Sequence, residues 1–242
     1  PDPIFGQAAS CSNLYDDGQT EIKPMPIDLT NADALLTTTR GVRRRIDFDR
    51  PVERSVIEDC VEVAMQAPYG LDWFTHFIAV TDPELRKRIG EIYDSVSAPY
   101  IDQLEADEMA KAEDDEAKAK VSKEMTLHRW YNTNMYRAPV LMVIAMEVEV
   151  NELNTSELAG VYGSCLPAAW SFMLALRARG LGTCWTTLHI YKQSEVDNIL
   201  GVPDGMTHVA LLPIGYYRGT DFKRAGRPIA KNWLHWNRYC AT

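Results

Sequence analysis

The feature that most constrains the fold is the uninterrupted apolar run VLMVIAM at residues 140–146. A short run of this kind predicts a fully buried strand. Further strands are expected at 74–80, 183–187 and 209–214, and helices at 51–67, from 83 onward, at 163–179 and at 194–200. Strands that alternate with helices along the chain indicate an α/β or α+β fold in one domain.

Composition excludes several classes of protein. The chain has 242 residues, 46% of them apolar and 24% charged, which is ordinary for a globular protein. A chain of this length buries enough apolar surface to fold without disulfides, so a disordered tail, a collagen-like repeat and a disulfide mini-scaffold are excluded. The formal net charge of −9 disfavours a general nucleic-acid binder, because an acidic protein repels phosphate backbones.

Cysteine and histidine spacing indicates neither a disulfide framework nor a metal site. The five cysteines are an odd number and no two have C-x-x-C spacing, which indicates reduced thiols in a cytoplasmic compartment. The five histidines form no H-x-x-x-H pair, so no metal is expected. The sequence contains no run of about 18 apolar residues, so no membrane span is predicted. The N-terminus lacks the pattern of a secretory signal.

Two stretches stand apart from the regular pattern. Residues 1–30 contain four prolines and two glycines with little periodicity, which predicts an extended N-terminal arm before a single domain at 31–242. Residues 105–124 are rich in Ala, Glu and Lys, which favours a helix with little apolar face. This stretch, within a variable region at 105–130, is either a solvated helix or a mobile lid over a site.

The densest positive charge lies in the segment TTTRGVRRRIDF, which carries Arg40, Arg43, Arg44 and Arg45. Arginine offers a planar fork of donors that matches phosphate oxygens, and Gly41 would let the backbone approach a ligand closely. In an acidic protein such a cluster suits one bound phosphate better than a polymer. The alternative is surface charge or local salt bridges. A second basic cluster, which could converge on the same phosphate, contains Lys223, Arg224 and Arg227.

The signatures of several other sites are missing from the sequence. It has neither G-x-G-x-x-G nor G-x-x-x-x-G-K-[ST], so Rossmann and P-loop sites lack their fingerprints. It has no G-x-S-x-G elbow, which argues against an α/β-hydrolase. Cys184 and His76 lie within predicted strands, where an inert buried thiol and a hydrogen-bonded histidine are expected. From the residues alone, the chain is a globular α/β protein with one phosphate site.

Four segments, in this order, are similar to parts of the flavin-dependent nitroreductase family. TTTRGVRRRIDFDRPVERSVIEDCVEVAMQAPYG resembles the family's N-terminal signature, with an Arg-rich opening, a helix start at Pro51-Val52 and a helix end at Ala67-Pro68. LPAAWSFMLALRARGLGTCWTT resembles its central helix and following strand. LGVPDGMTHVALLPIGYYRGTDF and RPIAKNWLHW resemble its closing strand and C-terminal tail.

The resemblance implies an α+β fold, a three-layer sandwich in which helices flank a central, mostly antiparallel sheet. It also implies an intertwined homodimer with two FMN sites at the interface, each built from both chains. The residues that match FMN-binding positions are Arg40, Gly41, Val42, Arg44, Pro68, Tyr69, Gly70, Asp72, Trp185, Thr186, Thr187 and Arg227. The implied substrate pocket contains Trp73, Phe74 and Tyr131.

The matched residues have distinct implied roles. Residues 40–44 match the segment on the flavin phosphate and ring edge, and Arg227 matches a C-terminal arginine on the phosphate. Residues 68–72 match a loop from the partner chain, and 185–187 match the strand end beside the isoalloxazine.

The implied activity is that of an FMN-dependent oxidoreductase. Hydride would pass from NADH or NADPH through flavin N5 to a small aromatic or conjugated acceptor, such as a nitroaromatic, quinone or enone, in a ping-pong cycle. No catalytic side chain, metal, nucleic acid or membrane is required. Two alternatives stay open: a flavin oxidase or dehydrogenase that uses oxygen, and a non-catalytic flavin-binding or storage protein.

One loop departs from the family pattern, with Asp72 where Asn is usual and Phe74 where Gln is usual. A carboxylate could still accept from flavin N3–H, but its charge would disfavour the anionic reduced flavin and lower the potential. Tyr69, Trp73 and Phe74 would give the pocket aromatic walls that suit a flat apolar substrate.

Overall fold

A four-stranded antiparallel sheet organises the chain. The computed structural model describes residues 27–70 and 75–239, and within them the strands lie in the order β1-β2-β4-β3. Their bounds are Thr75–Val80 for β1, Val140–Met146 for β2, Leu181–Thr183 for β3 and Thr207–Tyr216 for β4. The predicted strand at 140–146 is confirmed to the residue, and β1 and β3 form the two edges of the sheet.

The central strand β2 is buried along its whole length because helices cover both faces of the sheet. Val140, Met142 and Ile144 point into one core cluster, whereas Leu141 and Val143 point into the other. Alternate residues of a strand face opposite sides of the sheet, so an uninterrupted apolar sequence is required here.

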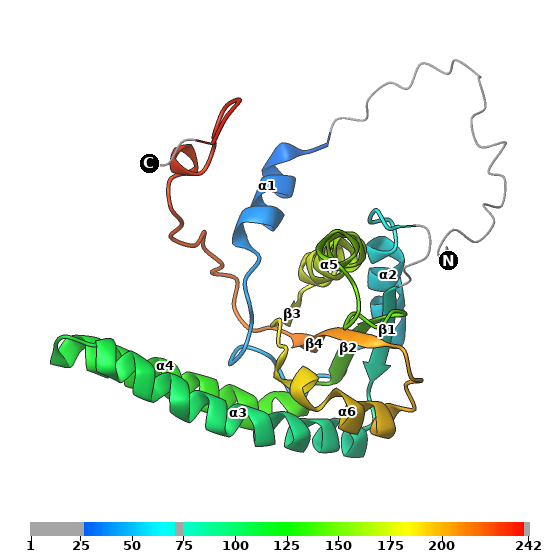
Figure 1. Cartoon of the computed structure of the whole chain (residues 1–242), viewed down its shortest axis with the longest axis horizontal. Helices are drawn as coiled ribbons and strands as arrows, with labels where there is room; N and C mark the ends of the chain where they lie inside the picture. The colour runs from blue at the N-terminus through cyan, green and yellow to red at the C-terminus, as the bar shows by residue number, and fades with distance from the viewer. Residues whose placement is uncertain (1–26, 71–74, 240–242) are drawn as a thin grey trace.

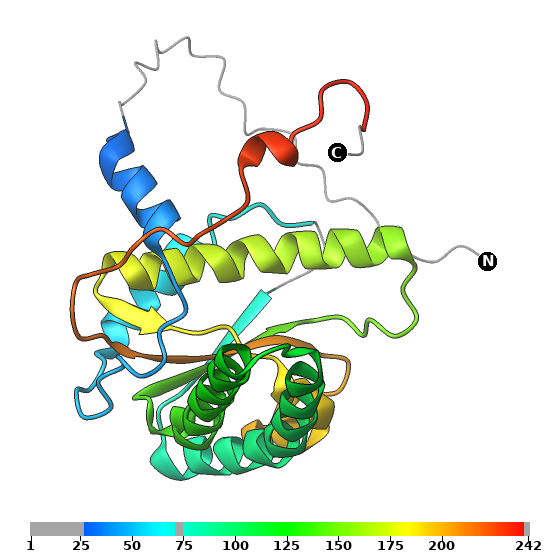
Figure 2. The ribbon, with the colours of Figure 1, turned by 90° about the vertical axis from the view of Figure 1, so that its left-hand side faces the viewer.

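Two helical layers enclose the sheet, which confirms the predicted three-layer α+β sandwich (Figure 1). One face is covered by α2 (Arg54–Ala64) and by the long helix α5 (Thr155–Ala178). The other face is covered by α3 (Pro83–Lys111), α4 (Asp115–Asn134) and α6 (Gln193–Leu200). Figure 2 shows α5 on one side of the sheet and the α3–α4 pair on the other. Short 3₁₀ turns occupy Met135–Arg137, Leu188–Lys192 and Ala230–Asn232.

Side-chain caps fix the starts of α3 and α5. Asp82 accepts hydrogen bonds from the amides of Glu84 and Leu85 at 2.8 and 2.9 Å, so α3 begins where the sequence predicts. A capping box between Asn154 and Glu157 starts α5, eight residues before the predicted start at Gly163.

Several predicted bounds are corrected. Residues 105–124 are not one helix, because α3 ends at Lys111 and the side chain of Asp114 caps a new helix, α4. The strand predicted at 183–187 ends at Thr183, and α6 begins after Lys192 rather than at a Ser194 cap. Pro51 and Glu53 precede α2 instead of forming its first turn.

Both ends of the described chain stand away from the sandwich. Helix α1 (Leu29–Thr38) starts inside the predicted arm and has no buried residue; residues 1–26 of that arm lie outside the described residues. The C-terminal segment after β4 runs past α1 in extended form (Figure 1).

By length and composition α5 could cross a membrane, although no span was predicted. Its inner face, including Cys165, Ala169 and Phe172, is buried in the core cluster beside the sheet. That placement is typical of the central helix of a folded domain.

Candidate functional site

The arginine-rich segment lies along β3, an edge strand of the sheet. The Val42 amide donates to the Thr183 carbonyl at 2.8 Å, and the Val42 side chain is buried. A Cβ on Gly182 would lie only 2.8 Å from Val42 Cβ, so the glycine permits this close approach. The structure therefore brings predicted residues 40–44 beside the strand that leads to Trp185–Thr187.

The four arginines of the segment have different surroundings. Arg40 donates to the carbonyls of Thr37 and Thr39 at 2.8 and 2.6 Å, at the C-terminus of α1. Arg44 is exposed, with its guanidinium 5.5 Å from the centre of the Trp130 ring. Arg43 lies 5.6 Å from the Tyr131 ring.

Arg45 holds the start of the C-terminal segment in place. It donates to the Arg218 carbonyl at 2.7 Å, pairs with Asp221 at 3.1 Å and lies 4.4 Å from the Phe222 ring centre. Through these contacts Arg45 has a structural role, in agreement with the alternative interpretation that some of these arginines form salt bridges. They also bring the chain that leads to Lys223, Arg224 and Arg227 alongside the first basic cluster; Arg227 itself is exposed.

Part of the segment 184–187, which follows β3, packs against the core. The Thr186 hydroxyl donates to the Leu211 carbonyl at 2.6 Å, and the two residues form an isolated backbone bridge. Trp185 is partly buried against the core beside α5, whereas Thr187 is exposed. Of the three predicted residues, Thr187 presents its side chain most openly.

Tyr131, which the resemblance places in the substrate pocket, is buried in this chain. It is 3% exposed and packs in the core cluster between the sheet and α3. Burial raises the pKa of its hydroxyl well above the usual value, and raises that of Tyr93 to about 12. Burial also raises the pKa of the Cys184 thiol, which keeps it protonated, as expected for an inert cysteine.

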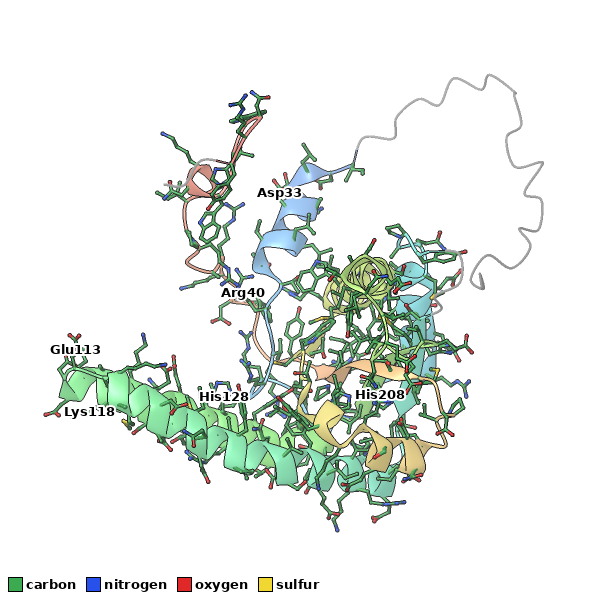
Figure 3. All side chains as sticks on the ribbon, in the orientation of Figure 1. Asp33, Arg40, Glu113, Lys118, His128 and His208 are labelled. Atoms are coloured by element: carbon green, nitrogen blue, oxygen red, sulfur yellow. The ribbon has the colours of Figure 1, made fainter. Side chains whose placement is uncertain are left out.

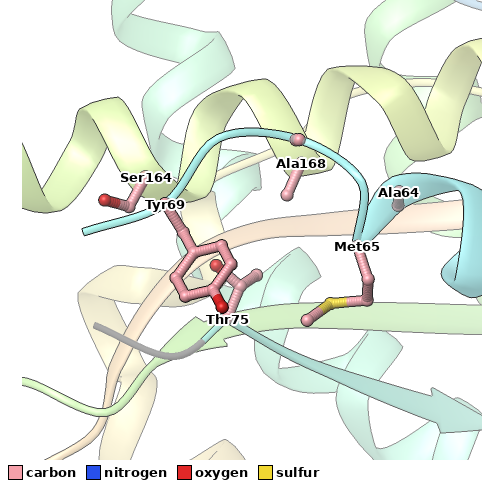
Figure 4. A pocket seen from close by; sticks show the side chains of 7 residues that line it. Ala64, Met65, Tyr69, Thr75, Ser164 and Ala168 are labelled. Carbon is pink, nitrogen blue, oxygen red and sulfur yellow. The ribbon is translucent and has the colours of Figure 1, made fainter. Parts of the chain in front are cut away.

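Residues 68–70 lie at the other edge of the sheet, between α2 and β1. The Gly70 amide donates to Ser164 Oγ of α5 at 2.8 Å, and Tyr69 is 62% exposed. Tyr69 lines a small, mostly apolar cavity of about 150 Å³ (Figure 4). The other residues around this cavity are Ala64, Met65, Ala67, Thr75, Ser164 and Ala168. The predicted residues Asp72, Trp73 and Phe74 lie outside the described residues.

The described parts of the two predicted halves lie at opposite edges of the sheet. Residues 40–44 lie at the β3 edge, and the loop with Pro68, Tyr69 and Gly70 leads into β1 at the other edge.

Large apolar side chains are exposed on α5 and along the C-terminal segment. On α5, Leu166 and Trp170 are 41% and 42% exposed. Along the C-terminal segment, exposed apolar side chains are Ile229, Trp233, Leu234, Trp236 and Tyr239. Exposed apolar area of this extent is typical of an interaction surface.

The sequence analysis did not identify a buried histidine pair. It also did not include Arg43 among the residues that match FMN-binding positions. His189 and His208 lie under α6 with ring centres 5.4 Å apart, and His208 Nε2 is 2.9 Å from Asp197 Oδ1. The three residues are far apart in sequence, so no local spacing signals them. Across residues 27–70 and 75–239, no group of three His, Cys, Asp or Glu side chains could hold a metal ion.

Comparisons with known proteins identify relatives of this arrangement. A family model described as "Nitroreductase family" matches residues 40–216. A search of the curated proteins found no match.

Solved structures share the fold at low sequence identity. Oxidized iodotyrosine deiodinase bound to FMN and 3-iodo-L-tyrosine superposes with a TM-score of 0.62 and 18% identity, over 86% of this chain and 99% of that chain. The NfrA1 nitroreductase of B. subtilis superposes with a TM-score of 0.62 and 16% identity, over 88% of this chain and 76% of that chain. The NADPH:FMN oxidoreductase of Vibrio harveyi complexed with NAD+ superposes with a TM-score of 0.59 and 15% identity, over 88% of this chain and 79% of that chain.

Proposed function

Because the chain belongs to the Nitroreductase family, whose model matches residues 40–216, we propose that it is an FMN-dependent oxidoreductase. It transfers hydride from NADH or NADPH to a small aromatic or conjugated acceptor in a ping-pong cycle. The observation that carries this proposal is the arginine-rich segment fixed along β3 by Val42, at the start of the matched region. Structural relatives whose descriptions include FMN support it.

The residues of this segment suit the phosphate of FMN. Arg40 uses two of its five N–H donors on carbonyl oxygens, which leaves three for a ligand. Arg44 is exposed, and Arg43 Nε is buried without a hydrogen-bond partner in the part of the chain that the structure describes. Cations gathered in this way in a protein of net charge −9 favour one bound anion.

When bound, FMN supplies the hydride chemistry at N5, which no side chain can perform. The chain's own part is to bind, orient and shield. The Val42–Thr183 hydrogen bond and the close contact with Gly182 fix the arginine segment, so its donors are placed before the ligand arrives. Trp185 and Thr187, which follow β3, would then lie beside the ring of a flavin held by this segment.

We also propose that the working unit is a homodimer. The opposite placement of residues 40–44 and 68–70 supports a site shared between two chains. The exposed Leu166 and Trp170 of α5 supply an apolar surface for the contact. In this arrangement Tyr69 of one protomer would wall the site that Arg40 and Arg44 of the other begin.

The test is an absorption spectrum of the purified protein, repeated anaerobically with NADH or NADPH. We expect an oxidised-flavin spectrum that bleaches with one nucleotide. Arg40→Gln should weaken FMN binding by at least tenfold, and Arg54→Gln, an exposed arginine on α2, should not. A protein that neither contains nor takes up FMN would refute the proposal.

The same experiment separates the remaining alternatives. Flavin that resists both nucleotides, but is reduced as a substrate is desaturated and is then reoxidised by oxygen with release of hydrogen peroxide, indicates an oxidase. Flavin that is inert to donors and oxygen indicates a storage protein. Parallel lines in double-reciprocal plots against donor and acceptor would support the ping-pong cycle.

A further inference from the structure

Helices α3 and α4 form a long hairpin that projects from the sandwich (Figure 1). Glu113 and Lys118 mark its outer end, and His128 lies where it meets the body (Figure 3). Arg129 of α4 contacts Asp102 Oδ1 and Glu105 Oε2 of α3, each at 2.7 Å. This double ion pair ties the two helices together near the body, so side chains on α4 hold defined positions relative to the arginine segment.

A cavity of about 500 Å³ lies between α4 and the arginine segment. We call it the Lys120–Lys123 cavity; its lining residues are Arg44, Lys120, Lys123, Glu124, Thr126 and Leu127. Three cations and one carboxylate give its lining a net charge of +2, in a chain whose formal net charge is −9. Positive charge concentrated in a hollow attracts anions.

None of the three cations is held in an ion pair within the described residues. Among residues 27–70 and 75–239, Arg44, Lys120 and Lys123 form no ion pair, whereas Arg45 and Arg129 do. Glu116 precedes Lys120 by about one helical turn, yet the two are not paired. Like charges that face one cavity repel each other, so an anion placed between them relieves the repulsion.

The surroundings of the cavity are partly aromatic. The Arg44 guanidinium lies 5.5 Å from the Trp130 ring centre, and Trp130 stacks on Phe48 at 6.2 Å. His128 adds no positive charge at neutral pH, because burial and then the charge of Arg43 lower its pKa. The charge therefore comes from Arg44 and the two lysines, beside a surface that suits a planar ring.

We propose that the Lys120–Lys123 cavity binds an anionic oxygen group, a carboxylate or a phosphate, of the substrate that reacts at the flavin. This inference rests on the proposed function, because Arg44 belongs to the segment that would hold FMN; where Arg44 contacts the flavin phosphate, Lys120 and Lys123 against Glu124 still leave the cavity lining with a net positive charge. An acceptor with a carboxylate, or NADPH through its 2′-phosphate, would be anchored here while its reacting part lies at the flavin. The hairpin is then a substrate-recognition element.

The test reverses the charge on α4 and compares matched substrates. The double variant Lys120→Glu/Lys123→Glu is assayed with 4-nitrobenzoate against neutral 4-nitrobenzamide, and with NADPH against NADH. We expect KM to rise at least tenfold for the anionic member of one pair and less than twofold for its partner, with kcat nearly unchanged. Lys118→Glu, on the same helix but outside the cavity, is the control for long-range charge and should change neither pair.

The two arms identify the source of the anion. A shift confined to nitrobenzoate assigns the cavity to the acceptor, and a shift confined to NADPH assigns it to the donor. Equal effects on both members of both pairs, or no effect, would overturn the proposal while leaving the flavin enzyme intact. A wild-type protein that takes up no FMN fails at the earlier step instead. Equilibrium binding of 4-nitrobenzoate to wild type and variant, measured by calorimetry, provides a readout that does not depend on turnover.

Discussion

The histidine pair under α6 should make this protein unfold in acid at a higher pH than protonation of its carboxylates alone would cause. His189 is completely buried, and neither of its ring nitrogens has a hydrogen-bond partner in the described part of the chain. Burial, and then the nearby His208, lower the pKa of His189 to about 3. Burial also lowers the pKa of His208, although Asp197 opposes that shift through its contact at 2.9 Å.

The size of the effect follows from the difference between the folded and unfolded states. An unfolded histidine titrates near 6.5, so below that pH the unfolded chain binds a proton that folded His189 refuses. The contribution of His189 to the free energy of unfolding is therefore fully present above pH 6.5 and is lost progressively as the pH drops toward 3. Between pH 7 and 4.5, His189 alone should remove about 2.5 kcal/mol from the free energy of unfolding, and His208 adds to the loss.

The assay is urea unfolding at fixed protein concentration at pH 7, 6, 5 and 4.5. His189→Leu should lose at least about half of the pH dependence in this window, whatever its stability at pH 7. His76→Leu, which removes a histidine whose side chain is 44% exposed, is the matched control for the substitution itself. A wild type that loses less than about 1 kcal/mol over the window, or a His189→Leu variant with the wild-type slope, would refute the reasoning.

Three further predictions concern the site and its supports. Gly182→Ala should weaken FMN binding about tenfold in a flavin-fluorescence titration, because the added methyl group would lie 2.8 Å from Val42 Cβ. The second substitution Val42→Ala should restore FMN binding, and a double variant that still binds FMN weakly would disprove the role of this contact. Arg129→Leu should speed amide hydrogen exchange in residues 105–124 while costing less than about 1 kcal/mol of global stability, and unchanged exchange would show that its ion pairs do not hold the hairpin. Trp170→Asp should yield a monomer by size-exclusion chromatography with light scattering; a surviving dimer would place the interface elsewhere.

The parts of the fold that sequence predicts well are those determined by local pattern. The run at 140–146 is confirmed as β2 because a strand buried on both faces has to be apolar throughout. Asp82 sets the start of α3 through its own side chain. The start of α5 was missed although the Asn154–Glu157 capping box is visible in the sequence. Residues 105–124 look like one helix because composition dominates the pattern, and the Asp114 cap that divides them is a single residue.

The site is predicted less completely because side-chain direction depends on tertiary contacts. Four arginines within six positions have no period that distinguishes a ligand-binding group from a structural one. Arg45 is committed to Arg218 and Asp221 only because the chain after β4 returns past it. Tyr131 follows the exposed part of α4 closely in sequence, but the hairpin brings it under the sheet.

The order of the strands links the proposed flavin site to the proposed dimer. Val42 is hydrogen-bonded to Thr183 of β3 and Ile46 pairs with Tyr217 just after β4, whereas the loop at 68–70 leads into β1 at the opposite edge, so the sheet itself separates the two segments. Neither segment can reach the other without crossing the two central strands. A site that used both segments, as proposed above, would therefore draw them from two copies, which a two-fold axis would relate. The exposed Leu166 and Trp170 of α5 offer an apolar surface on which that second copy could pack.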